Sequence, residues 1–151
     1  MKSLSFLIDT DWVIDHFNGI AQVTRRLQEL QPQGLALSII SSAELWEGAY
    51  FSREPKRSQA MLGEFLAGVV ILGLDEDMCK RFGQLRGSLR MRGQTVGDFD
   101  LLIAATALRH NFRRRSIDRT SWPEMCSIWN RSVLCFRRRS ARMLAASLPP
   151  L

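Results

Sequence analysis

The sequence predicts an α/β fold in which helices cover a largely parallel sheet. Three short apolar runs, "LSFLID", "LALSII" and "VVILGL", have the length and composition of strands, and the first is expected to be buried. Segments with helical periodicity separate these runs, and strands that alternate with helices form parallel sheets. The 151 residues are enough for one domain with its own core, and no internal repeat is present.

The first half of the chain is predicted to hold two strands and the helices between and after them. These elements are a strand in 4–9, a short helix in 10–19, a helix in 20–34, a strand in 35–40, a helix from 41 onwards and a further helix after Pro55. Gly19 is a natural end for the first helix, and Pro32 and Gly34 are expected to end the second. Ser41 or Ser42 is expected to cap the third helix, which places Glu44 in its first turn.

The second half begins with a β-branched strand in 69–74. Asp75 is the expected cap of the amphipathic helix that follows, and a turn at 94–97 leads into the last clear helix. The side chains expected to face inward from these two helices are Met78, Phe82, Leu85, Leu89, Leu102, Ile103 and Ala107. Beyond residue 111 the periodicity is weak, although "SVLCF" has the composition of a strand.

Charge is distributed unevenly along the chain. Residues 1–108 carry 11 Lys and Arg against 13 Asp and Glu, which gives 11 − 13 = −2. Residues 109–151 carry 10 Arg against 2 acids, which gives 10 − 2 = +8 and accounts for the total of +6. Such a basic segment attracts polyanions, but a solvated basic tail has the same composition, so both interpretations stay open.

Several function classes are not expected. No run of about 18 apolar residues is present, so no membrane helix is predicted. The N-terminus reaches Asp9 too early for a secretory signal, whose apolar region runs about 7–15 residues. The three cysteines are scattered and lack a C-x-x-C spacing, so we expect no zinc site and a cytoplasmic location with reduced thiols.

Carboxylates stand at three junctions between a strand and a helix or at a helix start. Asp9 ends the first strand, Glu44 follows the second, and Asp98 and Asp100 begin a later helix. Sites in parallel sheets gather at the carboxyl ends of the strands, so these acids can converge on one cleft. Grouped acids need a cation, and a hard ion such as Mg²⁺ would also activate water and stabilise an attacked phosphodiester.

Each acid also has a purely structural explanation. Asp9 can cap the helix that follows it, Glu44 can complete a capping box with Ser41, and Asp98 or Asp100 can cap the last helix. Taken singly, each cap is the simpler explanation. Taken together, the placement of all of them at such junctions favours a shared site.

Three stretches resemble the acidic motifs of the PIN-domain family, above all its VapC-type ribonuclease toxins. They are "FLIDTDWVIDHFNG", "LSIISSAELWEGA" and "VGDFDLLIAATALRHN", and the likeness covers roughly residues 4–111. The resemblance implies a PIN-like α/β/α sandwich whose acids Asp9, Glu44 and Asp100 bind Mg²⁺ or Mn²⁺, with Asp98 as a companion. It further implies cleavage of RNA, a homodimer, and neutralisation by a cognate antitoxin.

The C-terminal part departs from this family pattern. Where the family continues with an apolar strand, this chain has "FRRR", and burial of three guanidinium groups would be costly. By position, Ser116 and Asp118 align with the family's Thr-x-Asp motif and Trp122 with its aromatic residue. We therefore expect a PIN-like core in 1–111 and a divergent basic part in 112–151, and one hypothesis is that a frameshift replaced the original C-terminus.

The leading interpretation is a Mg²⁺-dependent endoribonuclease toxin, and the alternative is a catalytically impaired PIN-like protein that binds RNA or an antitoxin without cleaving. The residues expected to act are Asp9, Glu44 and Asp100 as metal ligands and catalytic groups, Asp98, Asp118 and Ser116 as assisting groups, and Arg113, Arg114, Arg115 and Arg137 to Arg139 as RNA contacts. Four aromatic residues, Trp12, Trp46, Tyr50 and Phe51, either belong to the core or form a surface for a dimer or an antitoxin.

Overall fold

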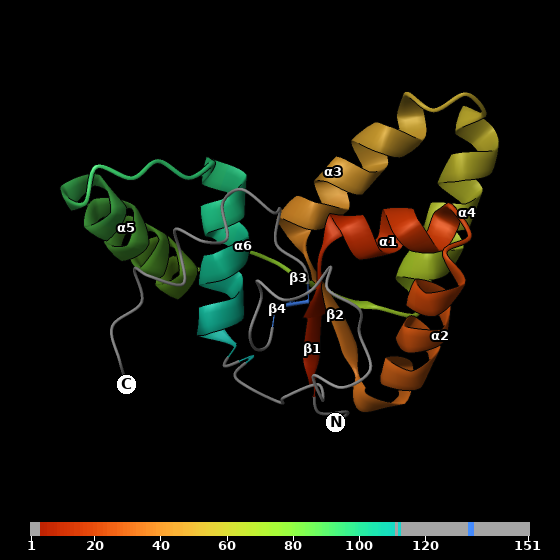
Figure 1. Ribbon diagram of the computed structural model, residues 1–151, viewed down its shortest axis with the longest axis horizontal. Coiled ribbons are helices and arrows are strands. Elements are labelled where there is room, and N and C mark those ends of the chain that lie inside the picture. The colour runs from red at the N-terminus through yellow and green to blue at the C-terminus, as the bar shows by residue number, and fades with distance from the viewer. Residues whose placement is uncertain (1–3, 111, 113–132, 135–151) are drawn as a thin grey trace. The chain divides into compact units, whose positions relative to one another are not determined.

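The computed structural model describes residues 4–110, 112 and 133–134, and the chain forms two compact units, Met1–Gly73 and Leu74–Leu151. The first unit contains three parallel strands, β1 (Phe6–Ile8), β2 (Leu35–Ser38) and β3 (Val70–Leu72). β2 lies between the other two, pairing Leu7 with Ala36 on one side and Leu37 with Ile71 on the other. The predicted α/β fold class with a parallel sheet is confirmed (Figure 1).

Helices connect these strands within the first unit (Figure 1). They are α1 (Thr10–Phe17), α2 (Ala21–Leu30), the 3-10 turn η1 (Gln31–Gln33), α3 (Ile39–Tyr50) and α4 (Pro55–Ala67). Gly19 and Gly34 have φ values of 77° and 91°, a left-handed region that favours glycine. Gly19 follows the C-cap of α1, as predicted, whereas α2 ends at Leu30 and Gly34 ends the 3-10 turn that comes after it. α2 follows its predicted periodicity, since Val23, Leu27 and Leu30 are buried.

The core of the first unit lies around β1 and β2. All residues of both strands are buried, and Leu7, Ile8 and Leu37 have no exposed surface. This is the burial expected for parallel strands that are covered on both faces. The predicted third strand is confirmed as β3, which is more exposed than the other two: Val70 is 48% exposed, and the strand pairs with β2 on one side.

The boundary between β2 and α3 differs from the prediction. The sequence suggested a strand through residue 40 and a cap at Ser41 or Ser42, but β2 ends at Ser38 and the helix begins at Ile39. The hydroxyl oxygen of Ser38 accepts a hydrogen bond of 2.9 Å from the Ser41 N–H and so caps the helix. The strand therefore passes into the helix without a loop, which turns two apolar strand-like residues into the first turn of α3.

The second unit is described mainly by two packed helices, α5 (Glu76–Met91) and α6 (Asp98–Arg109), together with the short strand β4 (Val133–Leu134). β4 falls within the segment "SVLCF", for which a strand was considered. The inward positions that are confirmed as buried are Met78, Leu85, Leu89, Ile103 and Ala107. Phe82 and Leu102 are half-buried instead, so the apolar stripes are narrower than the periodicity suggested.

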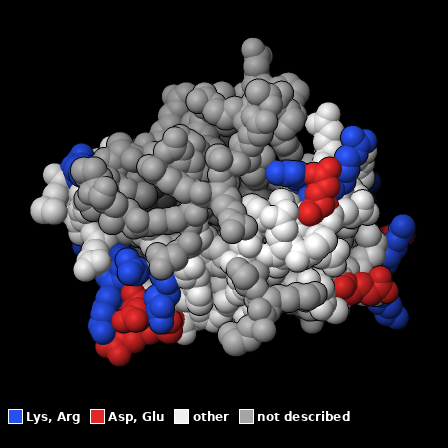
Figure 2. Space-filling model, turned by 90° about the horizontal axis from the view of Figure 1, so that it is seen from below, with Lys and Arg blue, Asp and Glu red and all other residues white. Residues whose placement is uncertain are grey.

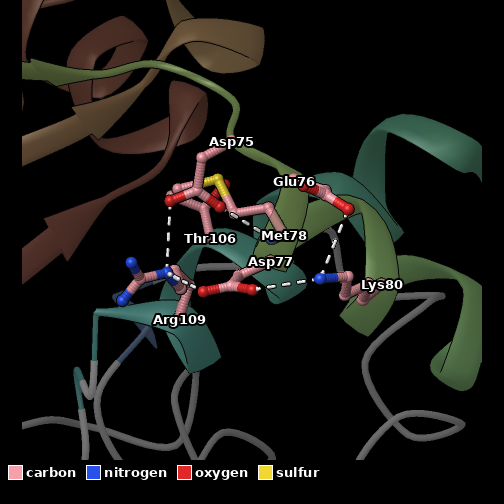
Figure 3. Close-up of polar contacts among 7 residues, drawn as sticks. All are labelled: Asp75, Glu76, Asp77, Met78, Lys80, Thr106 and Arg109. Carbon is pink, nitrogen blue, oxygen red and sulfur yellow. Dashed lines mark hydrogen bonds and ion pairs between the residues drawn. The ribbon is translucent and has the colours of Figure 1, made fainter.

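The N-terminus of α5 is tied to the last turn of α6 (Figure 3). Asp75 accepts a hydrogen bond of 2.8 Å from the Met78 N–H, which confirms it as the cap of α5. Nε of Arg109 lies 3.1 Å from Oδ2 of Asp75 and 3.5 Å from Oδ2 of Asp77. The Met78 N–H and then the Arg109 charge hold the pKa of Asp75 below its ordinary value of 3.8.

Acidic and basic side chains of the described residues lie together in mixed groups (Figure 2). Examples are Arg57 with Glu54 at 3.0 Å and Lys80 with Glu76 at 3.3 Å. Exposed pairs of this kind add little stability, and the charge of each acid in them is offset by a neighbouring base. Within the described ranges, no helix has the length and apolar character needed to cross a bilayer.

Candidate metal-binding site

Asp9 lies directly after β1 and is only 4% exposed. It is the N-cap of α1, as the structural alternative predicted, because its Oδ1 accepts a hydrogen bond of 2.8 Å from the Thr10 N–H. The hydroxyl of Ser41 also points to Oδ1, at 3.5 Å. A buried carboxylate is stabilised both by hydrogen bonds of this kind and by a nearby positive charge. The cap and a metal-ligand role are therefore compatible.

Glu44 lies in the second turn of α3, and its Oε2 accepts a hydrogen bond of 2.8 Å from the Thr10 hydroxyl. The suggested capping box with Ser41 is wrong, because the cap of this helix is Ser38 and the residue three positions later is Ser41. Glu44 thus has no role at the helix start. Its side chain is instead held beside the first turn of α1.

Thr10 joins the two acids of the first unit. Its backbone N–H donates to Asp9 and its hydroxyl donates to Glu44, so two carboxylates distant in sequence lie on either side of one residue. The strand register explains the meeting, since Ile8 pairs with Leu37 and the next residues along the two parallel strands are Asp9 and Ser38. The carboxyl ends of β1 and β2 therefore deliver Asp9 and the start of α3 to the same place.

Three residues at this place were not among the predicted site residues. Thr10 bridges the acids, while the Ser38 and Ser41 hydroxyls lie 2.9 Å apart and Ser41 reaches Asp9. Ser38 and Ser41 have no exposed surface. A signal was present in the sequence, because short hydroxyl side chains directly after two parallel strands are well placed to orient acids at that edge.

The other two acids belong to the second unit. The N-cap of α6 is Gly97, so the suggestion that Asp98 or Asp100 is the capping residue is wrong. Asp98 is exposed and forms an ion pair with Arg86 of α5. Asp100 is half-buried in the first turn, where its Oδ2 approaches Gly97.

The ligand chemistry fits a divalent ion such as Mg²⁺, which prefers oxygen donors and is held in proteins by one or two carboxylates. Asp9 and Glu44 provide such a pair in the first unit, and Asp98 and Asp100 provide two more acids in the second. Among the described residues, no group of three or more His, Cys, Asp or Glu side chains is arranged to hold a metal. The convergence of Asp9, Glu44 and Asp100 therefore stays a prediction.

The remaining predicted residues lie outside the described part of the chain. They are Arg113, Arg114, Arg115, Ser116, Asp118, Trp122 and Arg137 to Arg139. Of the aromatic residues, Trp12 is buried in the core, whereas Tyr50 and Phe51 are 58% and 86% exposed. Trp46 is half-buried, and its ring centroid lies 6.2 Å from that of Tyr50.

Comparison with known proteins identifies the fold. The family model described as "PIN domain" matches residues 6–117. The tRNA(fMet)-specific endonuclease VapC of Shigella flexneri is 30% identical over 104 residues, which cover 69% of this chain and 79% of that protein. Ribonuclease VapC1 of Methanocaldococcus jannaschii is 36% identical over 106 residues, covering 70% of each.

A solved structure gives the same result. The crystal structure of VapBC2 from Rickettsia felis, bound to a DNA fragment from its promoter, contains a chain similar to this one, with a TM-score of 0.65 and 28% identity. The match covers 70% of this chain and 81% of that chain. The family match over residues 6–117 contains the strands and helices that carry all four acids of the candidate site.

Proposed function

Because this chain belongs to the PIN-domain family, and within it to the VapC-type endoribonuclease toxins, we propose that it cleaves RNA phosphodiester bonds with a divalent ion held by Asp9, Glu44 and Asp100. The ion in this proposal is Mg²⁺ or Mn²⁺. The observation that supports the assignment is that Thr10 donates its backbone N–H to Asp9 and its hydroxyl to Glu44, at the carboxyl end of β1.

Each residue has a distinct task in the proposed reaction. When bound, the ion supplies positive charge to the attacked phosphodiester and makes water more acidic. The buried carboxylate of Asp9 would anchor the ion, and the hydrogen bond from the Thr10 hydroxyl would hold the Glu44 carboxylate as a second ligand. Asp100 completes the ligand set from α6. Ser116 and Asp118 are proposed to assist from the basic C-terminal part.

The basic C-terminal part is proposed to hold the RNA backbone. Arg113, Arg114 and Arg115, together with Arg137 to Arg139, provide the positive charge that the core lacks, since residues 1–108 sum to −2. Binding through phosphates should weaken steeply with salt, by about 0.7 in the logarithmic slope for each phosphate of a single strand. A solvated tail without RNA contacts would give a shallow slope.

The proposal includes two protein partners. One is a cognate antitoxin, as in the VapBC complexes to which the chain is structurally similar, and the other is a second copy of the chain. The exposed rings of Tyr50 and Phe51 at the end of α3 support an interface there, since aromatic residues are enriched in the centres of interfaces. Replacing both with Ser should shift the purified protein towards the monomer in light scattering. A cytoplasmic location, where RNA and antitoxin are available, is part of the proposal.

The test is cleavage of a panel of tRNAs and structured RNAs by the purified full chain. Cleavage should require Mg²⁺ or Mn²⁺, stop in EDTA, and disappear in Asp9→Asn and Asp100→Asn. An Asp11→Asn variant, in which the next acid after Asp9 is changed, is the matched control and should retain cleavage. Cleavage in EDTA, or in either active-site variant, would contradict the proposal, and RNA binding without cleavage would favour the impaired alternative.

A further inference from the structure

The first turn of α6 contains a close approach between a carboxylate and a glycine. Gly97 is the N-cap of the helix, and Asp100 stands three residues later, on the same face. A Cβ placed on Gly97 would lie 3.3 Å from Oδ2 and 3.8 Å from Cγ of Asp100. The first distance is shorter than an ordinary van der Waals contact, so a side chain at 97 would require the Asp100 carboxylate to move by a few tenths of an ångström.

The backbone does not require a glycine at this position. Gly97 has φ −59° and ψ 145°, a conformation open to every residue, unlike the positive φ of Gly19 or Gly93. Glycine is also a weaker N-cap than Ser, Thr, Asp or Asn, because those residues stabilise a helix through a side-chain acceptor that glycine lacks. The contact with Asp100 is therefore the local feature that explains glycine here.

Two further contacts restrain the first turn of α6. The Leu101 N–H donates to the Gly97 carbonyl at 3.0 Å and closes the first turn. Asp98 is bound by Arg86 of α5, whose guanidinium carbon also lies 5.6 Å from the centre of the Phe82 ring. Because these contacts restrain the backbone of the turn, we expect the Asp100 side chain, rather than the helix start, to adjust to a new Cβ, which changes the orientation of its carboxylate.

We propose that Gly97 is a positioning residue for Asp100: the missing side chain at 97 leaves the space in which the Asp100 carboxylate is held in its metal-binding orientation. This inference rests on the proposed function, in which Asp100 is a ligand of the ion. Gly97 itself touches neither the ion nor the RNA. Its effect is exerted through the orientation of one carboxylate.

The experiment is a titration of the metal-free full chain with Mn²⁺, followed by calorimetry, for the wild type and for Gly97→Ala. Displacing a ligand through a neighbouring residue typically weakens metal binding about 10–100-fold, and we expect the Mn²⁺ dissociation constant to rise by at least about tenfold. The melting temperature in EDTA should stay the same or rise, because alanine restricts the unfolded chain. A merely structural glycine would show the opposite pattern.

Gly97→Ser provides a second variant with the same Cβ and a hydroxyl that can cap the helix. It should fold at least as well as the wild type and lose Mn²⁺ affinity as Gly97→Ala does. Gly87→Ala is the matched control, since a Cβ at that position in α5 meets nothing within 4 Å. It should leave the Mn²⁺ affinity unchanged.

The outcomes separate this inference from the function on which it rests. If the wild type binds Mn²⁺ and Asp100→Asn binds it weakly, but both Gly97 variants bind as the wild type does, the positioning role is overturned and the metal site stands. If the wild type binds no Mn²⁺, or Asp100→Asn binds it unchanged, the proposed ligand set itself fails. Lower stability with unchanged affinity in Gly97→Ala would also overturn the inference.

Discussion

The hydroxyl of Thr10 donates a hydrogen bond of 2.8 Å to Oε2 of Glu44, 34 residues further along the chain. Because the N–H of the same residue donates to Asp9, Thr10 controls the relative position of two carboxylates that we propose as metal ligands. A threonine in the first turn of α1 is thus part of the candidate site, although its own oxygen is not required as a ligand.

Replacing Thr10 with Val should separate the two effects of this residue. The backbone N–H to Asp9 is kept and the hydroxyl to Glu44 is lost, so Mn²⁺ affinity and RNA cleavage should each fall about tenfold. The loss of one hydrogen bond should lower the free energy of unfolding by about 1 kcal/mol. Thr10→Ser keeps the hydroxyl and should retain most of the activity, and an active Thr10→Val would show that Glu44 needs no such partner.

Asp9 should respond differently to Asn and to Ala. Asn keeps an acceptor oxygen for the Thr10 N–H and removes a buried charge, so the melting temperature in EDTA should be equal or higher while cleavage disappears. Asp9→Ala also removes the cap and should lose a further ~1 kcal/mol of unfolding free energy. Urea denaturation and RNA cleavage test both variants, and full cleavage by Asp9→Asn would exclude Asp9 as a ligand.

Ser38→Ala should weaken the start of α3, the helix that carries Glu44. The variant removes the acceptor for the Ser41 N–H and a hydroxyl partner at 2.9 Å, all in a fully buried place. We expect the free energy of unfolding to fall by about 1–2 kcal/mol, measured by urea denaturation. Ser88→Ala, inside α5, is the control and should change stability by less than about 0.5 kcal/mol. Equal effects in the two variants would argue against a cap at Ser38.

The Asp75 cap makes a pH-dependent contribution to stability. Its pKa is lower in the folded protein than the ordinary 3.8, so the unfolded chain binds this proton more readily. The contribution is therefore complete above pH 3.8 and is lost as the pH falls through the lower folded pKa. Asp75→Asn should be less stable than the wild type at pH 7 in urea denaturation, and this difference should shrink below pH 3.8. A constant difference across this range would contradict the lowered pKa of Asp75.

Much of the fold could be predicted because the signals are local. Apolar runs of strand length and stretches of helical periodicity placed β1, α2, α5 and α6 close to their observed ranges. The error at β2 has a clear cause: Ile39 and Ile40 have strong strand propensity, but the cap made by Ser38 starts the helix before them. The helix cap formed by the Ser38 hydroxyl therefore outweighed the strand propensity of Ile39 and Ile40.

The candidate site was predicted less completely, because orientation depends on neighbours that are distant in sequence. The acids were recognisable from their places at strand ends, whereas Thr10 and Ser41 gained their significance only from contacts to Glu44 and Asp9. From the sequence, Glu44 could be explained locally as part of a capping box with Ser41. In the structure α3 begins at Ile39 with Ser38 as its cap, so this explanation does not apply.

The sequence by itself determines which segments form strands and helices, because these signals depend on periodicity and composition over a few residues. It also shows that acids follow the strands. The folded first unit adds the register of β1 against β2, which pairs Ile8 with Leu37 and so sets Asp9 beside the start of α3. This register joins residues about thirty positions apart because both strands are buried in the same core. The sequence around one strand does not specify which residue of the other strand it will pair with.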